Sequence, residues 1–267
     1  MGRDGETKMR LHPTELKQSM LTRYILLIFG VVLLASIAST SVAADRPNII
    51  VLLADDLGYG SLNSYGADEA HICTPNIDRL AQSGRRFTDA STPSSVCSPT
   101  RYGLLTGRYD WRTDKKHGVL NTTDPLHIET SRSTIASLLK SAGYRTAAIG
   151  KWHLGYGSER HDFRKPLSPG PLDIGFDYHF AVPQNHGDAS GVYVRNRAVV
   201  GLRSDRTVAA GTSPYGREYM GIDAPQRVDV NVMDELTTDA IHWLERQSDD
   251  VPFLLYFTPV AIHFPYT

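Results

Sequence analysis

Apolar residues along positions 45–267 occur in short runs that alternate with amphipathic stretches. The run Asn48–Ala54 is almost continuously apolar, which is typical of a strand buried on both faces of a parallel sheet. Arg145–Ile149 and Phe253–Phe257 are further short strands of this kind. Strands that alternate with helices predict an α/β fold, with a mostly parallel central sheet flanked by helices and right-handed crossovers.

Boundary residues predict three helices. The first begins after Thr74 and ends at Gly84, and the second covers Thr134–Ala142. The third is capped by Asn231 and has an apolar stripe made of Val232, Leu236, Ala240, Trp243 and Leu244. Residues 155–230 are rich in Gly and Pro and weakly periodic, so we expect long loops there, over the edge of the sheet where ligands bind.

The N-terminal segment has the features of an export signal. Residues 25–38 are apolar and uncharged, but shorter than the roughly 20 residues that a bilayer span needs. Basic residues precede this run, and small residues follow it up to Ala44. We predict a signal peptide over residues 1–44, cleaved after Ala44, and an exported chain that is periplasmic or secreted and not inserted in the membrane. The alternative is an uncleaved N-terminal anchor.

The amino-acid composition excludes several classes of protein. With 28 Lys+Arg against 29 Asp+Glu, the net charge is −1, so a nucleic-acid partner is not expected. A hydrophobic content of 41% excludes a disordered chain. The 2 cysteines are too few for a disulfide scaffold or a zinc ribbon.

Polar residues follow the three predicted strands. Asp55 and Asp56 come directly after the first, Lys151 and His153 follow the second, and His263 lies shortly after the third. Ligands of open α/β sheets bind beyond the carboxyl ends of strands, so these side chains are expected at one edge. Each of these residues has an ordinary structural interpretation as well. Paired Asp residues, for example, are common in turns. Carboxylates are nevertheless the ligands that hard cations select.

Two interpretations of Cys97 conflict with each other. In an exported protein, Cys73 and Cys97 would by default form a disulfide, or Cys97 would be a buried free thiol. Pro99, however, suits the first turn of a helix and so places Cys97 at a helix N-terminus, where backbone N–H groups favour negative charge. Arg101 lies four residues later, within helical reach.

Two long segments carry a resemblance to a known family. Cys97–Arg108 resembles the Cys-x-Pro-x-Arg and Leu-Thr-Gly-Arg signature of the type I sulfatases, the formylglycine-dependent members of the alkaline phosphatase superfamily. Gly143–His153 is similar to their second signature, which ends in Gly-Lys-Trp-His. Weaker similarities lie in residues 46–58, 74–80 and 259–265. The chain is thus identified as a member of this family, with its sheet-and-helix fold.

The resemblance implies a modified nucleophile. A separate formylglycine-generating enzyme oxidises the signature cysteine, here Cys97, to formylglycine, whose hydrate attacks sulfur and later releases sulfate. Asp55 and Asp56 are implied ligands of one Ca²⁺, together with position 97. The implied substrate is a sulfated carbohydrate or an aryl sulfate, as in the arylsulfatases.

The resemblance also implies roles for four further residues. Arg101 and Lys151 orient the nucleophile and His153 stabilises it. Lys151 and His263 bind the sulfate oxygens, and His263 assists the leaving alcohol.

The sequence departs from the family in length and in one motif. Family members are roughly twice as long and carry a later Asp-Asn pair that completes the metal shell, whereas no Asp-Asn follows His153 here. We therefore expect residues 45–267 to be the N-terminal part of a catalytic domain, with its C-terminal portion missing and with weak or no activity. Two alternatives stay open: a phosphonate or phosphodiester hydrolase of the same superfamily, and a non-catalytic truncated exported protein.

Overall fold

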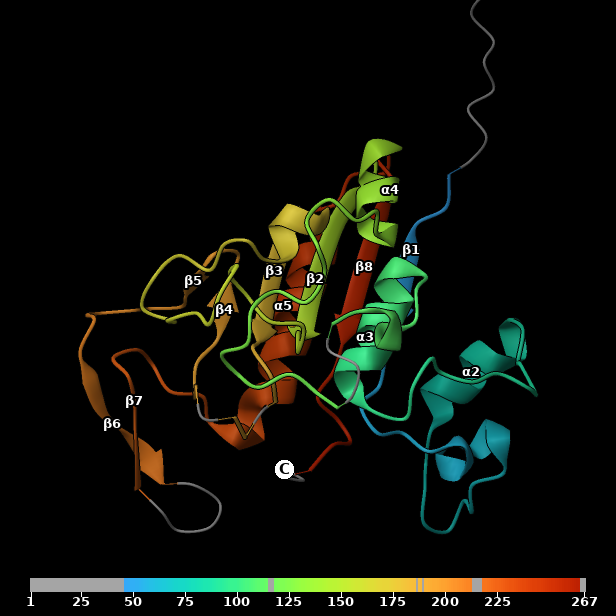
Figure 1. The fold of residues 1–267 in the computed structure, drawn as a ribbon. Helices are drawn as coiled ribbons and strands as arrows, with labels where there is room; N and C mark the ends of the chain where they lie inside the picture. Colours follow the sequence, from blue (N-terminus) through green and yellow to red (C-terminus); the bar gives the residue numbers. More distant parts are fainter. Residues whose placement is uncertain (1–45, 115–117, 186, 189, 213–217, 265–267) are drawn as a thin grey trace, which may run out of the picture. The chain divides into compact units, whose positions relative to one another are not determined.

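The structure is a computed structural model that describes residues 46–114, 118–185, 187–188, 190–212 and 218–264 (Figure 1). Residues 47–267 form one compact unit. The signal peptide predicted over residues 1–44 lies outside the described residues, so its boundaries stay a prediction. Among the described helices, none combines the length and the apolar character that crossing a membrane requires.

A six-stranded sheet forms the centre of this unit, in the order β1-β8-β2-β3-β4-β5. The pairs β1–β8, β8–β2 and β2–β3 are parallel, whereas β3–β4 and β4–β5 are antiparallel. The strands are β1 Ile49–Leu52, β2 Arg145–Lys151, β3 Tyr178–Val182, β4 Val194–Arg195, β5 Ala198–Val199 and β8 Phe253–Thr258. The predicted α/β fold with a mostly parallel sheet is confirmed.

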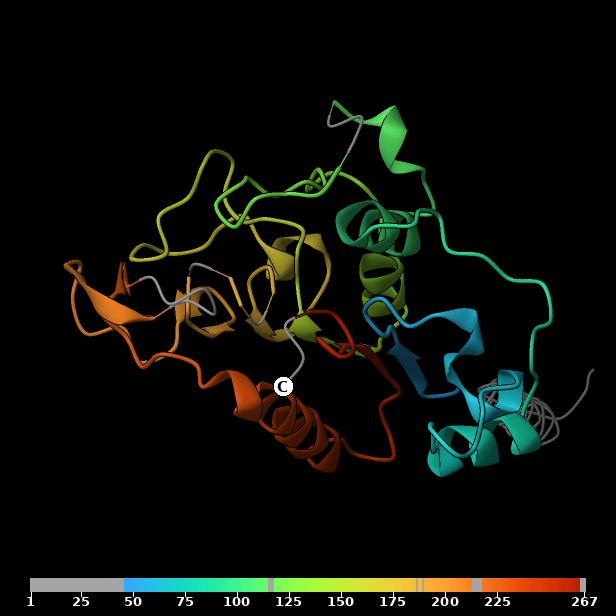
Figure 2. The same ribbon diagram turned by 90° about the horizontal axis from the view of Figure 1, so that it is seen from below.

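Helices cover both faces of the sheet, as Figures 1 and 2 show. Helices α3 (Cys97–Thr106) and α4 (Ile135–Ser141) lie on one face, and α5 (Val232–Glu245) lies on the other. Alternate residues of β2 point into two hydrophobic cores on opposite faces of the sheet. Ala148 packs in the core that includes residues of α3 and α4, whereas Ala147 and Ile149 pack with α5. This two-sided burial explains why the central strands are continuously apolar.

The predicted helices all form, with small differences at their ends. Helix α2 (Pro75–Ser83) begins after Thr74, and α4 begins with a capping box between Thr134 and Ser137. The side chain of Asn231, by contrast, makes no capping hydrogen bond. The short 3₁₀ helix η5 (Asp229–Asn231) leads directly into α5, so Asn231 already has helical backbone angles. The remaining 3₁₀ helices are η1 Tyr59–Ser61, η2 Asn63–Tyr65, η3 Asp110–Arg112 and η4 Pro171–Ile174.

The expectation of loops throughout residues 155–230 is wrong. This region supplies β3, β4 and β5 to the main sheet, and a separate antiparallel pair, β6 (Thr207–Thr212) with β7 (Glu218–Ile222). The strands β4 and β5 have only two residues each, too few to produce a periodic pattern. Strand β3 forms because it pairs with β2, a contact that local sequence does not reveal.

Candidate active site

The carboxyl ends of three strands meet the N-terminus of α3, at the end of the sheet that faces the viewer in Figure 2. Asp55 follows β1, Lys151 ends β2, His263 follows β8, and Cys97 is the first residue of α3. Lys151 Nζ lies 2.6 Å from Asp55 Oδ2 and donates to Cys97 Sγ at 3.3 Å. The prediction that Asp55, Lys151 and His263 lie at one edge of the sheet is confirmed, and the structure adds Cys97 to this group.

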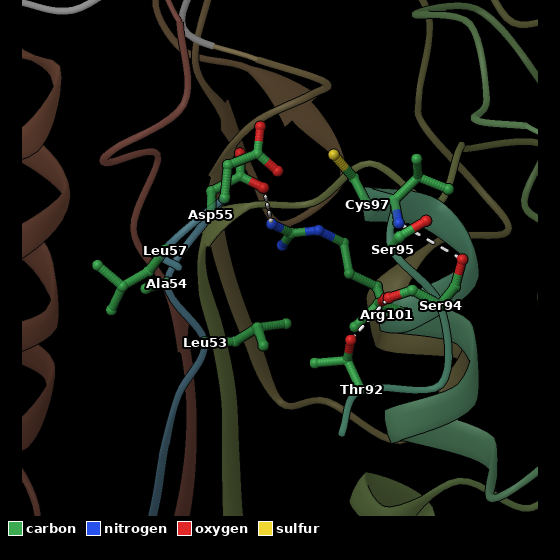
Figure 3. Close-up of a pocket in the computed structure, with 12 residues that line it drawn as sticks. Leu53, Ala54, Asp55, Leu57, Thr92, Ser94, Ser95, Cys97 and Arg101 are labelled. Carbon is green, nitrogen blue, oxygen red and sulfur yellow. Dashed lines mark hydrogen bonds and ion pairs between the residues drawn. The ribbon is translucent and has the colours of Figure 1, made fainter. Parts of the chain in front are cut away.

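A cavity of about 170 Å³ opens between the loop after β1 and the start of α3. Figure 3 shows the sulfur of Cys97 and the carboxylate of Asp55 on opposite sides of it, with the guanidinium of Arg101 extending between them. The cavity is lined by Leu53, Ala54, Asp55, Asp56, Leu57, Thr92, Ser94, Ser95, Val96, Cys97, Thr100 and Arg101. A small substrate group could therefore reach the thiol from solvent.

Asp55 is held rigidly and ionised. Its N–H donates to the Ala261 carbonyl at 3.0 Å, and its own carbonyl accepts from Ile262 N–H at 2.8 Å, so the segment after β8 fixes its backbone. Burial opposes ionisation of the carboxyl. The positive charges of Lys151 and Arg101 outweigh that effect and hold the Asp55 pKa below its usual range.

Arg101 ties α3 to the sheet. Its side chain is 1% exposed, and its Nη1 donates to the Lys151 carbonyl at 2.6 Å. Its Nη2 lies 3.4 Å from Asp55 Oδ1. Thr258 Oγ1 donates to the same Lys151 carbonyl at 2.7 Å. Arg101 therefore fixes the end of β2 and places positive charge beneath the cavity.

His153 is a buried, neutral imidazole. Its Nε2 lies 2.9 Å from the Leu120 carbonyl, which can only accept, so Nε2 carries the proton. Burial, reinforced by the charge of Lys151, lowers the His153 pKa to about 3. The other ring nitrogen, Nδ1, is buried without a hydrogen-bond partner in the described structure. His153 thus offers a vacant acceptor, and Ser98 Oγ, which donates to its carbonyl at 2.9 Å, attaches it to α3.

His263 is oriented by a residue that the sequence did not single out. Asn185 Nδ2 lies 2.8 Å from His263 Nδ1, so the Nε2 edge of the ring faces Asp56, whose Oδ2 is 3.7 Å away. The Asn185 N–H donates to the carboxylate of Asp188, which forms a buried ion pair with Arg227 at 3.3 Å. Asn185 lies in the weakly patterned region and belongs to no motif, so no sequence signal could have found it.

A cation could be held at this edge. Ligand atoms of Asp55, Cys97 and His263 all lie within 4.8 Å of one another. Asp56 is not part of this group, and its side chain is 56% exposed, with the backbone turned away from the strand at φ 63°. A thiol favours softer metals, whereas an oxygen in its place, together with carboxylates, suits a hard cation such as Ca²⁺. The donors present thus fit a divalent cation.

Both cysteines are free, and Cys73 is exposed. The disulfide that export would favour by default is therefore not formed in this structure. The thiol of Cys97 stays available next to Lys151.

Comparison with known proteins decides the family. The family model described as Sulfatase matches residues 47–267. The chain belongs to the sulfatase family. Among curated sulfatases, the N-acetylgalactosamine-6-O-sulfatase of Bacteroides thetaiotaomicron is 45% identical over 160 residues, which cover 60% of this chain and 31% of the relative. Arylsulfatase A of Bos taurus is 33% identical over 244 residues, covering 86% of this chain and 44% of the relative.

Solved structures agree with the sulfatase fold. A structure concerning metabolism of multiple glycosaminoglycans by Bacteroides thetaiotaomicron matches with a TM-score of 0.75 and 32% identity, over 83% of this chain and 52% of the other. The complex of Ps i-CgsB with k-i-k-neocarrahexaose matches with a TM-score of 0.59 and 26% identity, over 83% of this chain and 46% of the other. This sulfatase chain spans less than half the length of the two curated relatives.

Proposed function

We propose that this chain carries the nucleophile of a sulfuric-ester hydrolase that acts on a sulfated carbohydrate. The observation that carries the proposal is the placement of Cys97, at the N-terminus of α3 and 3.3 Å from the ammonium of Lys151. Helix N–H groups and a buried cation both favour negative charge at this position. Similarity to a sulfatase of N-acetylgalactosamine and to a protein bound to a carrahexaose supports a carbohydrate substrate.

We propose further that Cys97 is converted to formylglycine by a separate modifying enzyme. Oxygen in place of sulfur would give a Ca²⁺ ion two hard ligands, at Asp55 and at position 97. Asp56 lies outside this group in the structure, so its exposed side chain would have to turn toward the ion to supply the third. When bound, the cation supplies positive charge that offsets the charge of a sulfate ester. The residues of this chain would bind and orient the ester around it.

Lys151 and His263 are the groups that we assign to the sulfate. The Lys151 ammonium is buried between Asp55 and Cys97, where it can contact an anion placed against position 97. The Nε2 edge of His263 lies at the rim, where it can give a proton to the departing alcohol oxygen. His153, neutral and with Nδ1 vacant, accepts a hydrogen bond from the nucleophile and does not serve as an acid, while Arg101 holds β2 and α3 in register.

We also propose that residues 1–44 direct the protein to the periplasm or the medium. Cysteine modification would then precede or accompany export. N-terminal sequencing of the secreted protein should begin at about Asp45.

The deciding experiment is mass spectrometry of the peptide that contains Cys97. The chain is co-expressed with a formylglycine-generating enzyme, and we expect an aldehyde in place of the thiol. The Cys97→Ala variant is the control for peptide assignment and for turnover of 4-nitrophenyl sulfate. A thiol that stays unmodified, or a Cys73–Cys97 disulfide, would contradict the proposal. Modification decides because mass spectrometry detects it without any turnover of a substrate.

A further inference from the structure

The Cys97 thiol belongs to a group of three side chains that can all bind a metal. Ligand atoms of Asp55, Cys97 and His263 lie within 4.8 Å of one another. Within the described residues, no other three side chains of His, Cys, Asp or Glu meet this limit. The group differs from the ligand set that the sulfatase resemblance implies for Ca²⁺, because it contains His263 in place of Asp56. Its chemistry therefore suits a different ion.

The donors of this group are a thiol sulfur, an imidazole nitrogen and a carboxylate oxygen. Zn²⁺ is bound in proteins by donors of these three types, in a tetrahedral arrangement. Ca²⁺ instead takes about six to eight oxygen atoms, whereas the group offers only the oxygens of Asp55. Thiolate sulfur also selects softer cations than Ca²⁺. While position 97 is a cysteine, the donors therefore favour zinc.

The separations of the donor atoms fit one zinc ion after a small contraction. Zinc–ligand bonds of about 2.0–2.3 Å at tetrahedral angles place the ligand atoms about 3.5 Å apart. Because the atoms start within 4.8 Å of one another, any two of them need to approach by at most about 1.3 Å. Asp55 and Cys97 flank the same cavity, which can also hold a water ligand (Figure 3). The His263 side chain is 25% exposed, so its ring can rotate toward them.

The surroundings of His263 leave one ring nitrogen for a metal. Its Nδ1 contacts the Phe264 carbonyl oxygen at 2.5 Å and the side-chain amide of Asn185 at 2.8 Å. The Nε2 edge faces the exposed carboxylate of Asp56 and is the side left for a ligand. A carbonyl can only accept, so Phe264 supplies the partner that a protonated Nδ1 needs when Nε2 binds a metal. Histidine ligands commonly donate to a backbone carbonyl in this way.

The charges around the cavity are compatible with a bound cation. Lys151 is the main opposing charge, and its Nζ lies 2.6 Å from Asp55 Oδ2 and 3.3 Å from Cys97 Sγ. It leaves the Oδ1 atom of Asp55, whose contact with Arg101 is long, at 3.4 Å. The ammonium also stabilises negative charge on the sulfur, and the thiolate is the form that binds metals. Once the thiol proton has passed to solvent, the two aspartates and the sulfur carry one negative charge more than the two cations neutralise.

We propose that Asp55, Cys97 and His263 bind one Zn²⁺ ion while position 97 is an unmodified cysteine, with water as the remaining ligand. The inference goes beyond the proposed function, because it concerns the thiol form and does not require hydrolysis of a sulfate ester. Conversion of Cys97 to formylglycine removes the sulfur and should abolish zinc binding. The modification would thus exchange a zinc site for a site of oxygen donors.

Cobalt spectroscopy tests this on the full chain, expressed without a modifying enzyme. Co²⁺ replaces zinc at tetrahedral sites, and a sulfur ligand gives it a charge-transfer absorption that oxygen and nitrogen ligands do not. We expect Co²⁺ to produce this absorption and Zn²⁺ to remove it. Cys97→Ser should abolish the absorption and weaken zinc affinity at least about hundredfold, more than the loss of an outer hydrogen bond costs. The matched control is Cys73→Ser, which should behave as the parent because Cys73 is exposed and outside the group.

Alkylation of the parent chain, mapped by mass spectrometry, gives a readout that needs no variant. Zinc should protect Cys97 from iodoacetamide, whereas Cys73 should react to the same extent with and without zinc. His263→Ala should weaken zinc affinity about tenfold or more, and thermal unfolding checks that this variant folds. If it does not fold, the protection of Cys97 in the parent decides.

A charge-transfer absorption that persists in Cys97→Ser would overturn the proposal. Equal alkylation of Cys97 with and without zinc would overturn it as well, as would an unchanged zinc affinity in a folded His263→Ala variant. Zinc binding by a chain whose Cys97 stays a thiol after co-expression with a formylglycine-generating enzyme would support the zinc site and reject the proposed function. Conversion of Cys97 in a chain whose thiol form binds no zinc would do the reverse.

Discussion

Lys151 shows how a single buried charge links the stability of the protein to its proposed function. Its ammonium is fully buried, and its ion pair with Asp55, at 2.6 Å, removes the cost of isolating either charge from water. Arg101 adds a second, longer contact to the same carboxylate at 3.4 Å. The charges that would bind a sulfate are therefore already compensated within the protein.

Replacing Lys151 with Met should destabilise the protein, because Asp55 would lose its closest cation. We expect the free energy of unfolding to fall by about 3 kcal/mol in urea denaturation. The double variant Asp55→Asn with Lys151→Met should recover part of this loss, since the Asp55 charge is then removed as well. The recovery should be only partial, because the buried Arg101 loses its carboxylate partner. Equal stability of the single variant and the parent would contradict this account.

The pH dependence of stability should follow from buried histidines. Burial lowers the pKa of His153 and of His179 to about 3, below the usual 6.5. As pH falls below that usual value, the unfolded chain binds protons that the folded chain does not. Stability should therefore drop by about 1.4 kcal/mol per pH unit for each histidine, between about pH 6 and pH 4.

Urea midpoints measured across this range would show that slope. His153→Asn removes one titrating group and should lower the slope of stability against pH by about 1.4 kcal/mol per pH unit, the contribution of one histidine. Stability that rises as pH falls through this window would contradict the assignment of neutral, buried rings. The same assignment predicts that His153 does not act as a proton donor near neutral pH.

At the scale of elements, one glycine permits the close approach of β2 and β8. Gly150 has φ +119°, and a Cβ at this position would lie 2.1 Å from the Thr258 carbonyl oxygen. The Thr258 hydroxyl also donates a hydrogen bond to the Lys151 carbonyl, so the two strands meet beneath the candidate active site. A side chain here would separate the strands that deliver Lys151 and His263.

Gly150→Ala should thus cost about 3 kcal/mol or more, through overpacking and an unfavourable backbone conformation. Gly60→Ala is the matched control, because nothing lies within 4 Å of its added Cβ. Thermal unfolding of the two variants would compare them directly. Similar midpoints for both would show that β2 can move away from β8 without cost.

At the scale of the whole molecule, the sheet ends in a strand with one free side. Strand β1 pairs with β8, and within the described residues no strand pairs with its other edge. Ile50 and Leu52, on one face of β1, are 49% and 63% exposed. Unpaired strands with exposed apolar residues tend to associate with other chains.

We expect the chain to self-associate with rising concentration, and Leu52→Lys to reduce this association. Light scattering coupled to size exclusion measures both. Leu138→Lys is the control, because Leu138 is similarly exposed, at 60%, but lies on α4. A parent chain that stays monomeric at high concentration would show that β1 is protected in another way.

The sequence by itself determined the family and the class of fold. Cys97–Arg108 and Gly143–His153 are contiguous, so their chemistry can be identified without knowing the fold. The buried strands are equally local signals, because burial on both faces requires an unbroken apolar run. Since strands end at one edge of a parallel sheet, the convergence of Asp55, Lys151 and His263 followed from their positions.

Only the tertiary structure decided how the site is completed. Asn185 orients His263 from 78 residues away, and the Leu120 carbonyl fixes the His153 tautomer across 33 residues. The strands β3 and β4 likewise depend on pairing between distant segments. Such contacts leave no periodic pattern, because packing in three dimensions selects them, whereas backbone propensity and local motifs act only on neighbours in the chain.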